Sequence, residues 1–116
     1  MTPRMVAAND TIIAPASGAG RAAIAVIRIS GPGARSLLEA LAGGVPPARH
    51  ASLRAIGPPA RAVIDRGLVL WFPAPRSFTG EDMAELHVHG GRAVVREIVE
   101  AALALPGTRL AEPGEF

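Results

Sequence analysis

The order of apolar and polar residues predicts strands that alternate with helices. Strand character is strongest at residues 22–30, which are rich in β-branched side chains, and at 83–89, which alternate strictly. Apolar residues at helical spacing follow Pro32 and recur from 92 to 105. Weaker strands are expected at 10–13, 52–56, 62–64, 68–72 and 108–111, with a hairpin or bulge at 65–67. This order predicts an α+β fold in which a mixed, mostly antiparallel β-sheet packs with two main helices.

The strand at 83–89 has one polar and one apolar face. Side chains two residues apart on a strand share a face, so Glu85, His87 and His89 point together, away from the apolar residues between them. On the strand at 22–30, Arg28 lies among apolar residues, where a charge needs a carboxylate or an anionic ligand. Glu85 is a candidate partner. The continuous apolar run around Arg28 predicts a central strand that is covered on both faces.

The polar face is open to three interpretations. In the first it binds a ligand, and Gly90 and Gly91 lead into a helix whose free N–H groups suit an anion. In the second, His87, His89 and Glu85 hold zinc or a similar ion. In the third the face is purely structural, at a sheet edge or subunit interface. We favour ligand binding and expect no metal.

Composition limits the classes of function. The 116 residues are expected to form one domain, 1–116. The absence of cysteine excludes disulfides and thiol catalysis, and the absence of lysine excludes a G-x-x-x-x-G-K-[ST] phosphate loop. The net charge of +2 is spread without a basic stripe for nucleic acid. A dinucleotide-like pattern at 18–23 opens a strand rather than follows one, which argues against that function. Without an apolar leader or membrane span, we expect a cytoplasmic protein.

Several runs together carry a family resemblance. They are Asp10-Thr11-Ile12, Gly20-Arg21, residues 24–32, residues 67–75, Ser77-Phe78-Thr79-Gly80-Glu81-Asp82, residues 85–91 and Ala111-Glu112-Pro113-Gly114-Glu115-Phe116. Their order and spacing resemble the N-terminal domain of the tRNA modification GTPase family MnmE, also called TrmE. The chain departs from the family pattern in the loop at 17–23, and its stretch at 50–61 is shorter.

The resemblance implies a folate-binding, dimer-forming domain. Its fold would be similar to the folate-binding domain of the glycine-cleavage aminomethyltransferase. Arg28 and Glu85 match the family's folate-contacting arginine and glutamate, and His87, His89, Gly90 and Gly91 are further pocket candidates. The ligand would be a reduced folate, 5-formyl- or 5,10-methylene-tetrahydrofolate, and no residue is expected to be catalytic. A further family contact, a lysine, would lie downstream of Phe116.

The resemblance also implies a larger enzyme. Family members add a helical domain and an inserted GTPase domain that uses potassium and magnesium. With MnmG, a partner that carries FAD, they modify C5 of the wobble uridine of certain tRNAs, placing a carboxymethylaminomethyl or aminomethyl group there. By this resemblance the 116-residue chain is an isolated domain or fragment and should not hydrolyse GTP alone. A metal-binding or purely structural dimerisation domain is the alternative.

Overall fold

The structure, a computed structural model, describes residues 10–16, 23–58 and 62–116. Its elements, in chain order, are β1 (Thr11–Pro15), β2 (Ile24–Ser30), α1 (Ala34–Ala42), β3 (Ser52–Ile56), β4 (Asp65–Phe72), β5 (Met83–His89), α2 (Arg92–Leu103) and β6 (Thr108–Leu110). Ala22, predicted to begin a strand, and most of the dinucleotide-like pattern lie outside the described residues. The second helix ends two residues earlier than predicted.

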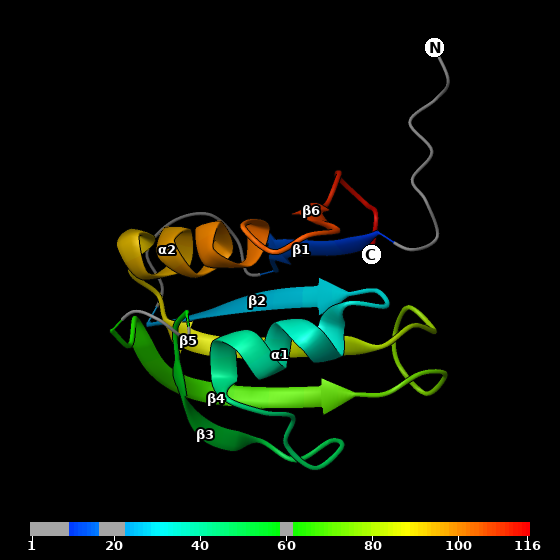
Figure 1. Cartoon of the computed structure of the whole chain (residues 1–116), viewed down its shortest axis with the longest axis horizontal. Helices are drawn as coiled ribbons and strands as arrows, with labels where there is room; N and C mark the ends of the chain where they lie inside the picture. Colours follow the sequence, from blue (N-terminus) through cyan, green and yellow to red (C-terminus); the bar gives the residue numbers. More distant parts are fainter. Residues whose placement is uncertain (1–9, 17–22, 59–61) are drawn as a thin grey trace.

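The described strands form one sheet in the order β3-β4-β5-β2-β1-β6 (Figure 1). Neighbouring strands are antiparallel except β1 and β6, which run parallel. A mixed, mostly antiparallel sheet with two helices confirms the predicted α+β class. No helix within the described residues is long and apolar enough to cross a membrane.

The core lies on one face of the sheet. Ile27, Leu86 and Val69 are fully buried there, in one cluster with buried residues of both helices. Figure 1 shows α1 lying across β4 and β5. Helix α1 contributes three core leucines at helical spacing, Leu37, Leu38 and Leu41. The prediction that both faces of β2 would be covered was wrong, since Ile24 is exposed and Arg28 half-buried. We call the face of the sheet that points away from the core, and that carries Ile24 and Arg28, the open face.

The strand register arranges the open face in rows, because residues paired across neighbouring strands share a face. Three rows can be traced: Leu53–Leu68–His87–Val26, then Leu70–Glu85–Arg28–Ala14, then Phe72–Met83–Ser30–Ile12–Arg109. The middle row contains the two residues expected to pair, Arg28 and Glu85. The sheet therefore brings together polar residues from distant parts of the sequence.

Gly67 shows why the hairpin or bulge predicted at 65–67 was wrong. Strand β4 runs unbroken through this stretch, from Asp65 to Phe72, whereas residues 62–64 lie before it and outside any strand. A Cβ on Gly67 would lie 2.4 Å from the carbonyl oxygen of His87. The glycine thus permits close approach of two strands rather than a turn. The chain reverses earlier, between β3 and β4, where the Ile64 amide donates to the Ile56 carbonyl at 2.8 Å.

Candidate ligand-binding site

Arg28 and Glu85 form an ion pair at the centre of the open face. They are register partners on β2 and β5, and Arg28 Nε and Nη2 lie 3.1 and 3.0 Å from Glu85 Oε2. The side chains are 32% and 18% exposed, so the pair is partly shielded but reachable. Because both strands are central in the sheet, the backbone holds the two groups in place.

His87 holds the other oxygen of the same carboxylate. His87 Nε2 lies 3.0 Å from Glu85 Oε1, and since a carboxylate only accepts, Nε2 donates. Burial acts to raise the pKa of Glu85, but the hydrogen bonds and charges of His87 and Arg28 outweigh it and lower this pKa below its ordinary value. Glu85 is therefore a preorganised anion near neutral pH.

A hollow of about 230 Å³ lies beside this pair. Phe72, Phe78 and Met83 supply its apolar walls, and Arg28 and Glu85 its polar side. Phe78 is 78% exposed, the most exposed large apolar side chain among the described residues. Phe72 and Met83 are register partners on β4 and β5, next to the row of the ion pair. The hollow thus offers an aromatic surface within reach of a charged donor and a charged acceptor.

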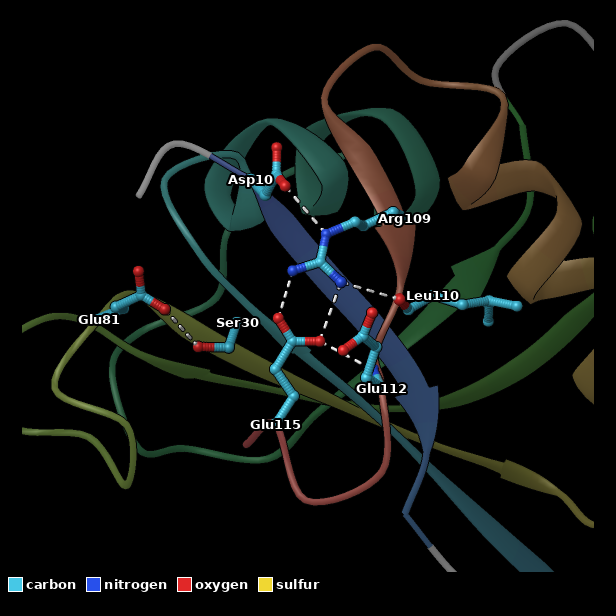
Figure 2. Close-up of polar contacts among 7 residues, drawn as sticks. All are labelled: Asp10, Ser30, Glu81, Arg109, Leu110, Glu112 and Glu115. Atoms are coloured by element: carbon cyan, nitrogen blue, oxygen red, sulfur yellow. Dashed lines mark hydrogen bonds and ion pairs between the residues drawn. The ribbon is translucent and has the colours of Figure 1, made fainter. Parts of the chain in front are cut away.

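The loop that carries Phe78 is fastened to the end of β2. Ser30 is fully buried, and its Oγ lies 2.7 Å from Thr79 Oγ1. The same hydroxyl donates to Glu81 Oε1 at 3.1 Å (Figure 2). Asp82 Oδ1 accepts from the Ala74 amide at 2.8 Å within the same loop. The polar residues of the Ser-Phe-Thr-Gly-Glu-Asp run therefore order the loop and leave its phenylalanine at the surface.

Arg28 also borders a second hollow, of about 380 Å³, on its other side. Its walls come from the end of β1, including Pro15, and from the chain after β6, including Pro113 and Phe116. The two hollows share Arg28 and are otherwise lined by different residues. A ligand longer than one ring could occupy both while contacting the same guanidinium.

The arrangement supports recognition more directly than acid–base catalysis. Glu85 can accept hydrogen bonds, Arg28 can donate them, and aromatic walls lie alongside. Such a set suits a flat heteroaromatic ligand that presents both donors and acceptors. Both oxygens of Glu85 already have partners, so a ligand must use its remaining acceptor sites or displace a partner.

Of the remaining predicted pocket residues, His87 contacts Glu85, and the others line neither hollow. His89 is 75% exposed at the end of β5, where its Nδ1 lies 2.9 Å from Asp65 Oδ1. His89, Gly90 and Gly91 line neither hollow beside Arg28. His87 does not line them either, and acts through Glu85. Their spacing in the sequence correctly placed His87 and His89 on the face of Glu85, but it did not show how far along that face the hollows extend.

The metal interpretation receives no support from the geometry of the two histidines. His87 and His89 contact different carboxylates, Glu85 and Asp65. Within the described part of the chain, no three histidine, cysteine, aspartate or glutamate side chains gather as potential ligands of one ion. A shared zinc site would need these pairs to separate.

The apolar walls of the two hollows were not predicted from the sequence. Phe72, Phe78 and Met83 come from a strand end and a loop, and the segment 111–116 lies far from Arg28 in the sequence. The signal available in the sequence for Phe78 was a phenylalanine inside a run of polar turn residues. Pairing between β1 and β6, which brings segment 111–116 near the site, was not apparent from the sequence.

The fold and this site define a class of domain: an α+β sandwich whose open sheet face presents an ionic pair between apolar walls. The chain belongs to the family described as "GTP-binding protein TrmE N-terminus", whose sequence model matches residues 11–116. This confirms the resemblance seen in the sequence.

Individual relatives agree with the family match. Proteins named "tRNA modification GTPase MnmE" from Chelativorans sp. (strain BNC1) and Methylobacterium sp. (strain 4-46) are 54% and 59% identical over 114 and 110 residues. These alignments cover 98% and 93% of this chain. They cover 26% and 25% of those relatives, so the chain spans about a quarter of their length.

Proposed function

We propose that this chain binds a reduced folate on its open face, at the Arg28–Glu85 pair. The observation that supports this most strongly is an ionised, preorganised carboxylate beside aromatic walls. The pterin ring of a reduced folate is flat and has amino and ring N–H donors that match Glu85. The bound group would supply a one-carbon unit, as 5-formyl- or 5,10-methylene-tetrahydrofolate.

The proposed roles follow from the contacts of each residue. Glu85 accepts hydrogen bonds from the ring, while His87 and Arg28 keep it ionised and oriented. Arg28 has further N–H groups that can donate to the ligand. Phe72 and Phe78 cover the ring and exclude water. These residues bind and orient the ligand, and none of them needs to exchange a proton with it.

We also propose that two copies of the chain pair through the open face. Ile24, Leu53 and Leu68 are exposed there, although large apolar side chains on one surface are usually covered. Leu53 and Leu68 are register partners, and Leu68 in turn pairs with His87. Such pairing would cover Leu53 and Leu68, whose row runs next to the row of Arg28 and Glu85.

In the larger protein, the chain would serve a tRNA-modifying enzyme. The relatives' printed name, tRNA modification GTPase MnmE, supports this assignment. The folate would provide carbon for the modification of C5 of the wobble uridine, together with the FAD-carrying partner MnmG. GTP hydrolysis, with its potassium and magnesium, belongs to a domain outside this chain. We place the protein in the cytoplasm.

Calorimetric titration with 5-formyltetrahydrofolate tests the ligand assignment. The parent chain should bind, and Glu85→Ala should lose most of the affinity, about 1.5–3 kcal/mol for hydrogen bonds to a charged group. Glu100→Ala, an exposed glutamate on helix α2, is the matched control and should bind like the parent. Equal affinity for Glu85→Ala and the control would show that the proposed pocket is wrong.

A further inference from the structure

A three-residue ionic cluster holds the end of the described chain against the sheet. Arg109 Nε donates to Asp10 Oδ2 and Nη1 donates to Glu115 Oε1, both at 2.9 Å, while Nη2 donates to Glu115 Oε2 (Figure 2). The planar guanidinium thus donates two hydrogen bonds to the carboxylate of Glu115 and a third to that of Asp10. We call Asp10, Arg109 and Glu115 the clamp.

The clamp is partly buried and electrostatically matched. Arg109 is 22% exposed, and its two partners have similar exposure. The hydrogen bonds to Glu115 and Asp10 raise the pKa of Arg109 above its ordinary value, so its charge is permanent. A shielded bidentate pair is geometrically specific, unlike a single pair of solvated surface charges.

The clamp closes a turn in the chain after β6. Glu115 Oε1 accepts from the Glu112 amide at 2.7 Å, and the Glu115 amide donates to the Glu112 carbonyl at 3.0 Å. At the start of the segment, the Ala111 amide donates to the Ile13 carbonyl at 3.0 Å. The turn is therefore tied at one end to β1 by backbone and at the other to β6 by Arg109.

The turn held in this way is a wall of the hollow beside Arg28. Residues 111–114 and Phe116 line that hollow, opposite the end of β1. Register places Arg109 beside Ile12, in the row next to the one that contains Arg28. The clamp and the candidate site are therefore neighbours on one sheet face, although Arg109 lines neither hollow.

We propose that Arg109 is a positioning residue for ligand binding, which sets the 111–116 wall, with Phe116, against the Arg28 side of the site. This inference rests on the proposed folate site and adds a residue to it. A wall fixed before binding costs no ordering entropy when the ligand arrives. Without the clamp, segment 111–116 would have to become ordered when the ligand binds, and this loss of entropy should lower the affinity for a reduced folate about tenfold.

The test compares Arg109→Gln and Glu115→Ala with the parent and with Arg96→Gln, an exposed arginine on α2. Titration calorimetry with 5-formyltetrahydrofolate measures affinity, and amide hydrogen exchange measures local order without ligand. Both clamp variants should bind about tenfold more weakly. Exchange should accelerate at 111–116 and stay unchanged in β2 and β5. Arg96→Gln should match the parent in both measurements.

The outcomes separate this inference from the function on which it rests. If the parent binds and both clamp variants bind equally well, the clamp has no positioning role and the folate site stands. Accelerated exchange throughout the sheet would mean that Arg109 merely stabilises the fold, which also overturns the inference. Should Arg109→Gln fail to fold, Glu115→Ala decides, since it keeps the Arg109–Asp10 contact and removes the carboxylate on the wall, together with its bond to the Glu112 amide. A parent chain that binds no folate refutes the proposed function and the ligand role of Arg109 together.

Discussion

Replacing Arg28 by alanine should destabilise the fold and raise the pKa of Glu85 at the same time. Glu85 is 18% exposed and would keep His87 as its remaining side-chain partner. A hydrogen bond to a charged group contributes about 1.5–3 kcal/mol. Because Arg28 is 32% exposed, solvent screening places the loss near the lower end, about 1.5 kcal/mol in the free energy of unfolding.

The contribution of Glu85 to the free energy of unfolding depends on pH in a definite direction. The pKa of Glu85 in the folded chain lies below its ordinary value of 4.5, so below that pH the unfolded state binds more protons. The stability due to ionised Glu85 is fully present above pH 4.5 and is lost as pH falls through the folded pKa. In Arg28→Ala the burial of Glu85 is less well opposed, so this acid-induced loss should shrink.

Urea unfolding of the parent, Arg28→Ala, Glu85→Ala and the double variant tests the reasoning. Trp71 is buried in the core and provides the fluorescence signal. Protein concentration must be constant, because pairing of chains would add to the apparent stability. We expect a coupling free energy of about 1 kcal/mol between the two substitutions at neutral pH, since the effects of substitutions at residues in contact are not additive. If the changes in unfolding free energy of the two single variants add up to that of the double variant within about 0.3 kcal/mol, at both neutral and acidic pH, the Arg28–Glu85 pair does not stabilise the fold.

Three other predictions concern the loop of Phe78, the exposed Leu68 and GTP. Ser30→Ala should cost about 1 kcal/mol in urea unfolding, through the hydrogen bonds to Thr79 and Glu81, and should weaken folate binding by loosening the loop of Phe78. Unchanged affinity would show that the loop is ordered without Ser30. Light scattering at micromolar concentration should give a dimer mass for the parent and a monomer for Leu68→Glu; a monomeric parent contradicts the pairing. Purified chain should release no phosphate from GTP, and activity that persists through further purification would contradict this.

Local sequence pattern predicted most of the fold. The β-branched run of β2 and the strict alternation of β5 marked two strands, and their register pairs Arg28 with Glu85. Helix α1 was marked by leucines at helical spacing. The pattern failed where a glycine had two meanings: at Gly67 it allows close strand approach and not a turn. It also failed for β2, because an apolar run does not reveal which face remains uncovered.

Of the candidate site, only the central row was predicted from the sequence. Charged residues on an apolar strand are visible in the sequence, so Arg28 and Glu85 were predicted as candidates, and their predicted pairing is confirmed. The walls depend on long-range pairing: β6 joins β1 in parallel and carries Arg109 and the 111–116 turn toward the site. No local periodicity encodes such a contact. His89 was drawn in by its spacing from Glu85, whereas its contact with Asp65 holds it at the strand end.

Nuclear magnetic resonance mapping of 5-formyltetrahydrofolate on the isotope-labelled chain tests most directly whether the open face binds the ligand. A ligand bound beside the Arg28–Glu85 pair should change the amide shifts around Arg28, Glu85, Phe78 and segment 111–116, with the helices little affected. A larger hollow, of about 510 Å³, lies between α1 and α2 on the opposite side of the sheet. Shift changes confined to that hollow, or none at saturating ligand, would contradict a folate site on the open face.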